Sequence, residues 1–289
     1  MEIRLRATRG LTIQASDSAD DEVFPAFYAG YDRAFTLPEE KETRTGFEVC
    51  LGLNHGQRSA EISASLGAFR EVVLVGRLDD EVVGGANVFV TPQTTHRVVT
   101  AALNYVYVLP GFRGRGLLRG IVQACCELGE TLFPGIGPIV LFVELNDPLL
   151  LTEAEYEQDS AAAGVDQFDR VAIWARLGVR ILDFPYVQPS LSPDQPADER
   201  LVLGVLAEPS FTLTGALLAD HLERFFAISV RKTGEIAPDD LAAAQIRDAR
   251  SRDLVPLLDP THALPTLRTR IGKSDIGFRD QLAELLRRP

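Results

Sequence analysis

The junction between a β-rich run and a helix at residues 98–132 constrains this chain more than any other segment. Residues 98–109 are rich in β-branched side chains, and Leu117–Leu132 has the apolar periodicity of a helix. Between them, Gly114 and Gly116 lack a Cβ, so backbone N–H groups of the turn can approach a ligand closely. The helix adds the positive end of its dipole, and three arginines add charged donors: Arg113, Arg115 and Arg119. The junction therefore predicts a site for a diphosphate.

This turn has three other possible interpretations. Gly114, Gly116 and Gly120 loosely match a dinucleotide fingerprint, but a Rossmann turn opens a βαβ unit, whereas this turn follows a β-hairpin and a third strand. A P-loop is excluded because the Gly-Lys-Ser/Thr sequence is missing. The plain alternative is a surface turn with solvated arginines. The proline, glycines and arginines fall together at a strand-to-helix junction, which favours the anion site.

The rest of the chain alternates β-rich and helical segments. Strands are expected at 2–14, 71–77, 82–90, 139–145, 179–187 and 201–206, with a hairpin turn at 78–81. Helices are expected at 24–35, 45–53, 169–177, 213–232, 238–250 and 278–288. Pro38 would end the first helix, and Gly178 would cap the helix at 169–177. Residues 1–208 therefore form one expected domain, and 209–289 a helical C-terminal extension.

Residues 108–116, Val-Leu-Pro-Gly-Phe-Arg-Gly-Arg-Gly, resemble the acetyl-CoA signature of the GNAT superfamily, Arg/Gln-x-x-Gly-x-Gly/Ala after a strand. The order of elements over 1–208 is similar to that fold too. The resemblance implies a mixed α/β (α+β) fold, with a mostly antiparallel central sheet flanked by helices. It also implies that turn amides hold the pyrophosphate of CoA and that the strand edge at 107–109 pairs with pantetheine. The implied coenzyme-binding residues are Tyr107, Val108, Leu109, Arg113, Gly114, Arg115, Gly116, Leu117 and Leu118. Leu118 stands where the motif has Gly or Ala, but it keeps its amide.

The activity that this resemblance implies is that of an acyl-CoA-dependent N-acetyltransferase. Such an enzyme moves an acetyl or short acyl group directly from acyl-CoA to a primary amine, through a tetrahedral intermediate. Two other functions stay open: a CoA-binding sensor or interaction module that has lost catalysis, and a nucleotide-dependent oxidoreductase. Residues 209–289 would pack on the domain or lie at a homodimer interface, since the stripe along 213–230 is apolar.

Glu144 is the candidate general base. It is a lone carboxylate in the apolar run 141–146, where burial raises the pKa of a carboxyl group. The run resembles the Leu-Glu-Val strand of ribosomal-protein alanine acetyltransferases, whose glutamate acts as the base. The alternative is a glutamate at the open end of the strand, paired with an arginine. Both interpretations stay open.

Other steps of the reaction have weaker candidates. Asn104 cannot accept a proton, but it could orient a water. Tyr186 is a candidate donor of the proton to the leaving thiolate, and the sequence does not separate it from Tyr105 and Tyr156. A backbone amide of residues 107–109 would stabilise the oxyanion.

Aromatic side chains are the candidate acceptor-binding residues: Tyr28, Tyr31, Tyr156 and Trp174. Trp174 stands where many relatives have a tyrosine that protonates the thiolate. An indole N–H lacks that acidity, so Trp174 is expected to line the acyl channel or to be a packing residue. Residues 147–166 carry six carboxylates and no Lys or Arg, which would attract a cationic amine. A solvated loop is the alternative.

Composition limits the remaining classes. A net charge of −12 disfavours nucleic acid as a partner. No apolar run reaches the roughly 18 residues of a membrane span, and the first residues lack the apolar core of a secretory signal. Cys50, Cys125 and Cys126 form no disulfide or metal-ligand framework. We expect a cytoplasmic protein that uses acetyl-CoA as co-substrate, without a metal or a membrane partner.

Overall fold

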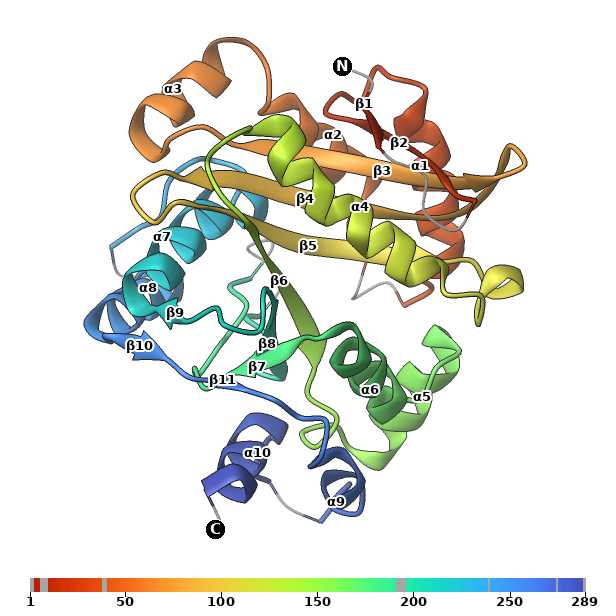
Figure 1. Cartoon of the computed structure of the whole chain (residues 1–289), viewed down its shortest axis with the longest axis vertical. Coiled ribbons are helices and arrows are strands. Elements are labelled where there is room, and N and C mark those ends of the chain that lie inside the picture. The colour runs from red at the N-terminus through yellow and green to blue at the C-terminus, as the bar shows by residue number, and fades with distance from the viewer. Residues whose placement is uncertain are drawn as a thin grey trace. The chain divides into compact units, whose positions relative to one another are not determined.

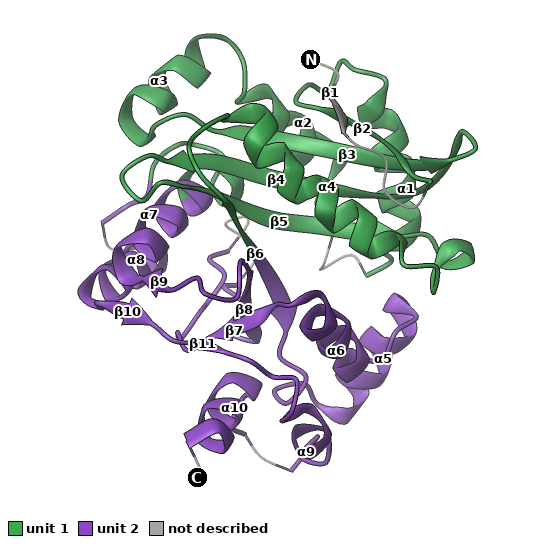
Figure 2. Cartoon of the chain, in the orientation of Figure 1, with its two compact units in different colours: residues 1–141, 227–235 green, residues 142–226, 236–289 purple. Residues whose placement is uncertain are grey.

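The computed structural model describes residues 3–5, 10–37, 41–190, 196–238, 240–273 and 275–287. The chain forms two compact units, which Figure 2 distinguishes by colour. The first contains residues 1–141 and Ala227–Glu235, and the second contains residues 142–226 and 236–289. The boundary expected at residue 208 stays a prediction.

The first unit is built on five antiparallel strands that lie side by side in chain order (Figure 1). They are β1 (Ile3–Leu5), β2 (Thr12–Ser16), β3 (Arg70–Leu78), β4 (Glu81–Gln93) and β5 (Val98–Val108). The single strand expected at 2–14 is wrong, because Leu5 pairs with Ile13 and the chain reverses between them. Gly10, with φ of +79°, lies in this reversal. Glu2 and residues 6–9 lie outside the described residues.

Two adjacent glycines of β4 show that helices cover both faces of this sheet. A Cβ on Gly84 would meet Ile121 of α4 (Leu117–Leu132), whereas a Cβ on Gly85 would meet the ring of Tyr107. Successive side chains of a strand point to opposite faces. The Tyr107 ring lies against Gly30 of α1 (Val23–Ala34). Helices α4 and α1 therefore pack on opposite faces.

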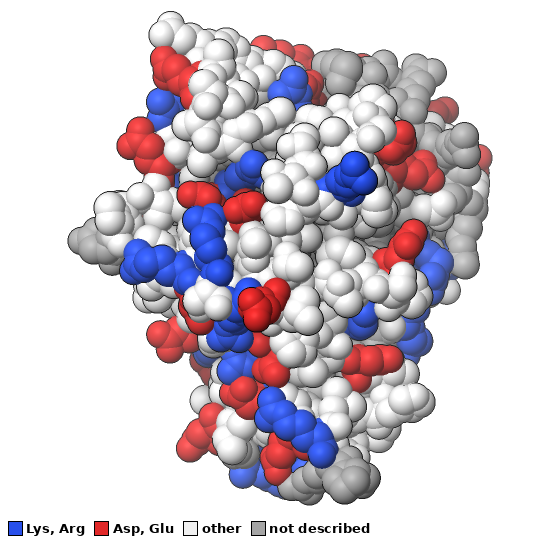
Figure 3. All heavy atoms as spheres, turned by 60° about the vertical axis from the view of Figure 1, so that its left-hand side comes forward, with Lys and Arg blue, Asp and Glu red and all other residues white. Residues whose placement is uncertain are grey.

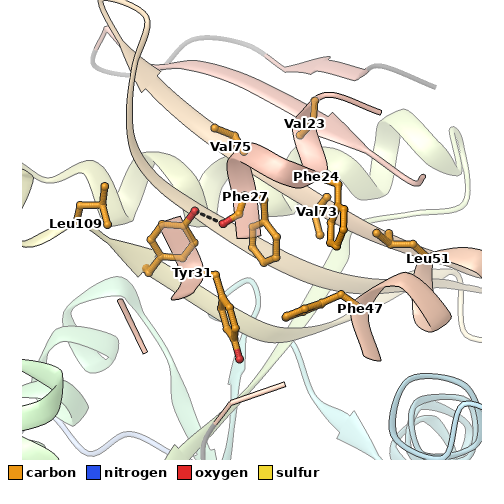
Figure 4. Packing of buried hydrophobic residues seen from close by; sticks show 10 residues of the cluster. Val23, Phe24, Phe27, Tyr31, Phe47, Leu51, Val73, Val75 and Leu109 are labelled. Carbon is orange, nitrogen blue, oxygen red and sulfur yellow. Dashed lines mark hydrogen bonds between the residues drawn. The ribbon is translucent and has the colours of Figure 1, made fainter. Parts of the chain in front are cut away.

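Aromatic side chains form the core on the α1 face (Figure 4). Phe24, Phe27 and Tyr31 recur at helical spacing and have no exposed surface. The Phe27 ring meets Phe47 of α2 (Arg44–Gly52) edge-on, with 5.4 Å between centroids. Tyr107 Oη donates a hydrogen bond to the carbonyl of Phe27 at 2.9 Å, which links β5 to α1. The helices expected at 24–35 and 45–53 are confirmed, and Pro38 lies outside the described residues.

Gly30→Ala should lower the free energy of unfolding by about 1–3 kcal/mol. The added Cβ would lie 2.3 Å from Tyr107 Oη, which its hydrogen bond to Phe27 holds in place. Gly52→Ala is the matched control, because this helical glycine has no atom within 4 Å of the added Cβ. It should raise stability by up to about 1 kcal/mol. Urea unfolding compares the two variants, and equal effects would contradict a tight contact at Gly30.

Helix α3 (Gly56–Leu66) was not expected from the sequence. Its only fully buried side chain is Ile62, so the apolar periodicity that marks an amphipathic helix is weak. The segment Ala227–Glu235 of the same unit packs beside it. A Cβ on Gly234 would meet Ile62 at 2.7 Å.

The second unit contains a sheet in the order β6-β8-β7-β11. These strands are β6 (Ile139–Asn146), β8 (Leu201–Leu206), β7 (Arg180–Leu182) and β11 (Leu257–Leu258), and residues 139–141 of β6 belong to the first unit. Strand β7 is antiparallel to both of its neighbours. The helices are α5 (Glu153–Ala163), α6 (Gln167–Leu177), α7 (Gly215–Arg224), α8 (Leu241–Ser251), α9 (Leu264–Arg268) and α10 (Phe278–Arg287). A short pair, β9 (Leu213–Thr214) and β10 (Leu254–Val255), lies apart from this sheet.

Several expected boundaries in this unit need correction. The strand at 179–187 ends at Leu182, and Pro185 beyond it has no N–H for a sheet. The helix at 213–232 begins as strand β9 and is α-helical only to Arg224; a π-helical turn, Phe225–Val230, follows. The acidic stretch 147–166 contains helix α5. Helix α6, with Gly178 at φ of +101° as its cap, is confirmed, and Arg288 lies outside the described residues.

The expected fold class is confirmed. The protein has a mixed α/β architecture, in which a mostly antiparallel sheet is flanked by helices, and further helices follow toward the C-terminus.

Candidate active site

The turn after β5 has the backbone that its glycines predict. A short 3-10 turn, Pro110–Phe112, follows the strand, and Gly114 and Gly116 then adopt φ of +76° and +74°. Gly116 is the N-cap residue of α4 and provides no side-chain cap. The first amides of a helix have no partner within it, so this end presents uncapped N–H donors with the positive end of the dipole.

Two arginines brace this turn. Arg113 Nε donates to the carbonyl of Val108 at 3.0 Å, and Arg115 Nη2 donates to the carbonyl of Gly111 at 3.3 Å. The guanidinium of Arg115 also lies 5.3 Å from the centre of the Phe112 ring, in cation–π geometry. Arg115 is exposed and Arg113 is half-buried. A guanidinium has five N–H donors, so the bond to the Gly111 carbonyl leaves Arg115 further donors for an anion.

The strand edge before the turn is partly engaged within the sheet. The Leu109 amide donates to Val83 of β4 at 2.9 Å, and the Tyr107 side chain is buried against α1. Leu117 is buried below the turn, and Leu118 is half-buried. The coenzyme-binding roles of these residues stay predictions. On this strand edge, the Leu109 amide already has a hydrogen-bond partner in the sheet, the carbonyl of Val83.

Glu144 and Tyr186 lie together in the second unit. Glu144 is half-buried on β6, and the Tyr186 hydroxyl donates a hydrogen bond to its Oε1. Gln188 Nε2 donates to Oε2 at 3.4 Å. Burial raises the pKa of Glu144 to about 7; the bond from Tyr186 opposes this rise, and the charge of Asp198 adds to it. Burial, together with the Glu144 charge, raises the pKa of Tyr186 well above its ordinary value.

Asn104 lies at a β-bulge of β5. Its neighbours Leu103 and Tyr105 pair with the adjacent β4 residues Val88 and Asn87, which leaves Asn104 as the extra residue. Strict alternation would place Asn104 and Tyr105 on opposite faces of the sheet. The bulge breaks the alternation, and the Asn104 side chain meets Asn87, the residue opposite Tyr105.

Asn104 belongs to a buried polar cluster around Glu71, which the sequence analysis missed. Asn87 Nδ2 and Asn104 Nδ2 donate to Glu71 Oε1 at 2.7 and 2.9 Å, and Ser229 Oγ donates to Oε2 at 3.2 Å. Burial raises the pKa of Glu71 to about 7, although all three hydrogen bonds oppose the rise. The only sequence signal is a glutamate at the start of a continuous apolar strand, at 71–75.

The four aromatic candidates divide between the two units, and the rings of Tyr28 and Tyr31 lie 6.0 Å apart in the first. Tyr28 is half-buried on α1, with the Arg44 guanidinium 5.5 Å from its ring centre. Tyr31 is fully buried and its hydroxyl accepts from the Glu42 amide at 2.7 Å, so contact with an acceptor would require it to move. Tyr156 donates to Asp166 at 2.8 Å, and Trp174 of α6 is buried. Tyr156 is thus held by the α6 N-cap and not by Glu144.

The acidic stretch 147–166 has basic partners from later in the chain. Arg200 pairs with Glu155 at 2.7 Å, and Arg268 pairs with Asp166 at 2.7 Å. Asp147 is buried and accepts from the Phe278 amide at 2.7 Å. On the face shown in Figure 3, basic and acidic side chains are likewise interspersed. These partners weaken the steering field that uncompensated carboxylates would produce, and the preference for a cationic acceptor stays a prediction.

The glycine turn thus joins the fifth strand of a mostly antiparallel sheet to helix α4. Residues 34–149 match the model of the acetyltransferase (GNAT) family. This segment includes the turn and Glu144, and the match confirms the resemblance seen in the sequence.

Solved structures with a similar fold are distant in sequence. The ribosomal-protein-S18-alanine N-acetyltransferase from Escherichia coli is 16% identical, with a TM-score of 0.39 over 70% of this chain and 98% of that chain. Arabidopsis thaliana Naa50, in complex with the bisubstrate analogue CoA-Ac-MVNAL, is 8% identical, with a TM-score of 0.37 over 68% and 99%. An aminoglycoside acetyltransferase from an uncultured soil metagenomic sample, in complex with sisomicin, is 17% identical, with a TM-score of 0.31 over 53% and 85%. Similarities this distant carry no conclusion about the acceptor. No curated protein sequence matches the chain.

Two further expectations concern a membrane-spanning helix and a metal site. Within the residues that the structure describes, no helix is long and apolar enough to cross a bilayer. Over the same residues, no group of three or more His, Cys, Asp or Glu side chains is arranged to hold a metal ion.

Proposed function

We propose that this protein transfers an acetyl or short acyl group from acyl-CoA to a primary amine. The observation that carries the proposal is the turn between β5 and α4. Within the segment that matches the GNAT family, Gly114 and Gly116 take positive φ values and open an uncapped helix N-terminus. Such an end binds phosphate groups through its N–H donors and its dipole.

The residues of this turn fit the diphosphate of CoA. A Cβ added at Gly111 or Gly114 would meet no atom within 4 Å, so open space borders the turn. Arg113 and Arg115 bring positive charge beside it in a chain of net charge −12. Bound acyl-CoA would supply the thioester carbonyl that the amine attacks.

Glu144 would act as the general base. Its pKa of about 7 leaves a fraction of the carboxylate ionised near neutral pH, and that fraction can take a proton from the acceptor amine at Oε1 or Oε2. The hydroxyl of Tyr186 stabilises the ionised form by donating to Oε1. Once the Tyr186 hydroxyl has given its proton to the leaving thiolate, protonated Glu144 can return a proton to Tyr186 Oη through the same contact. This arrangement favours a working enzyme over a CoA-binding module.

A thiol-release assay with acetyl-CoA and a panel of primary amines tests the proposal. Putrescine, benzylamine and a short peptide with an N-terminal alanine represent three acceptor classes. We expect amine-dependent release of free thiol with at least one class. Protection of the protein by CoA against heat, without thiol release from any amine, would instead support a CoA-binding module.

Gly114→Ala should weaken CoA binding about 5- to 30-fold, because a φ of +76° costs a residue with a Cβ about 1–2 kcal/mol. The matched control is Gly111→Ala. Gly111 has equally open surroundings but no positive φ, so CoA affinity should stay within about two-fold. Isothermal titration of CoA into each variant measures this. Equal losses at both positions would show that the backbone of Gly114 is not what the ligand requires.

A further inference from the structure

A segment from the C-terminal extension enters the polar cluster of the first unit. Ala227–Glu235 belongs to this unit, although the residues on either side of it belong to the second. Three contacts fix the segment there: an ion pair from Lys232 to Glu42, a hydrogen bond from Arg58 to the Thr233 carbonyl, and the packing of Gly234 on Ile62. The π-helical turn Phe225–Val230 places Ser229 at the cluster.

Ser229 helps to fix the orientation of the Asn104 amide. Asn104 Nδ2 lies 2.9 Å from Glu71 Oε1, 2.9 Å from Asn87 Oδ1 and 3.0 Å from Ser229 Oγ. Three acceptors around one nitrogen determine which end of the amide faces them. A flipped amide would bring its oxygen against a carboxylate and a second amide oxygen, which is repulsive.

The oxygen of the Asn104 amide has no hydrogen-bond partner among the described residues. Asn104 Oδ1 is screened from solvent, and within the described part of the chain no donor reaches it. Buried carbonyl oxygens in folded proteins are almost always hydrogen-bonded. Because the nitrogen is held by the cluster, Asn104 cannot turn to satisfy its oxygen. The atom is therefore an acceptor kept in place for an N–H or O–H group from outside the cluster.

We propose that Ser229 is a positioning residue that, with Glu71 and Asn87, holds Asn104 Oδ1 ready to accept an N–H of the acceptor amine. The inference rests on the proposed function. A neutral amine that donates one N–H to Oδ1 keeps its lone pair free for attack, and an amide oxygen orients the amine without taking its proton. The extension beyond the family-matched segment thus takes part in acceptor recognition.

Ser229→Ala tests this role through the split between KM and kcat. The KM for the panel amine with the highest turnover should rise about 3- to 10-fold, while kcat and the KM for acetyl-CoA stay within about two-fold. Thr233→Ala is the matched control, because its hydroxyl lies in the same segment but, among the described residues, bonds only within its own turn, to Glu235. It should leave all three constants unchanged. A Ser229→Ala variant whose amine KM equals that of the wild type would overturn the proposal.

A double-mutant cycle shows whether Ser229 acts through Asn104. Asn104→Ala should raise the amine KM by about 10-fold or more, and adding Ser229→Ala should then have no further effect. Independent, additive increases in KM would contradict the proposal, because they would mean that the serine affects the site without Asn104.

Side-chain amide NMR separates this inference from the proposed reaction. The Asn104 signals of ¹⁵N-labelled protein are identified by their loss in Asn104→Ala. They should shift when putrescine or benzylamine is added, whether or not any amine is acetylated. A shift without thiol release would retain the inference and reject the transferase. The absence of a shift with every panel amine would overturn the inference even if turnover occurs.

Discussion

Glu144→Gln should lower kcat for amine acetylation by about two to three orders of magnitude, because it removes the proposed general base. The glutamine keeps the shape and can still accept the hydrogen bond from Tyr186, so the KM for acetyl-CoA should change little. In the wild type, kcat at saturating amine should rise with pH and level off above the pKa of about 7, since only ionised Glu144 can take a proton. The variant should lose this rise. Thiol-release kinetics from pH 5.5 to 9 measure both effects.

Asp198→Asn is the control that tests the electrostatic origin of this profile. The charge of Asp198 contributes to the raised pKa of Glu144, so its removal should move the rising part of the profile toward acid pH. The plateau rate should stay near that of the wild type. A profile that does not move, or a Glu144→Gln variant with near-normal kcat, would assign the base to another residue.

Glu71→Gln should make the protein more stable than the wild type at pH 8, by roughly 2–3 kcal/mol, and nearly equal to it at pH 5. The folded-state pKa of Glu71 is raised to about 7 from an ordinary value of 4.5. Between these values the folded state binds more protons than the unfolded state, so wild-type stability falls as pH rises. Glutamine resembles the protonated carboxyl group and does not titrate. Chemical unfolding at both pH values measures the difference.

The comparison of Glu71→Gln with the wild type isolates the contribution of Glu71 to the pH dependence of stability. Glu144 titrates in both proteins, so its contribution cancels. Glu61→Gln is the control, since Glu61 is a surface residue with 49% of its side chain exposed. It should leave the pH dependence of stability unchanged. If the stability difference between Glu71→Gln and the wild type were the same at pH 5 and pH 8, ionisation of Glu71 would not destabilise the folded state. The prediction would then be wrong.

Local signals predicted the elements around the turn well. Helix α4 begins and ends where the apolar periodicity does, because Gly116 opens it and the glycines and prolines after 132 prevent its continuation. The pairing of Glu144 with Tyr186 was not predictable in this way. The two residues were separate candidates 42 positions apart, and only the path of the chain between β6 and β8 brings them together.

Two departures from the expected elements have local signals in the sequence. No helix was predicted in the stretch 147–166, yet Thr152 and Glu155 form a capping box that starts helix α5. The single strand at 2–14 ignored Gly10, which reverses the chain. No local pattern in the sequence indicates the bulge at Asn104 or the position of Ser229 beside it. Both depend on contacts between segments far apart in sequence, which periodicity does not register.

The alternation of the chain between its units has a consequence for how the protein can evolve. The backbone passes from one unit to the other at 141/142, at 226/227 and again at 235/236 (Figure 2). No single breakpoint therefore yields two intact pieces. Gene recombination that joins the acetyltransferase part to another protein would have to carry Ala227–Glu235 along, or leave Asn104 and Glu71 without Ser229. The two units are thus expected to be inherited together rather than exchanged as separate modules.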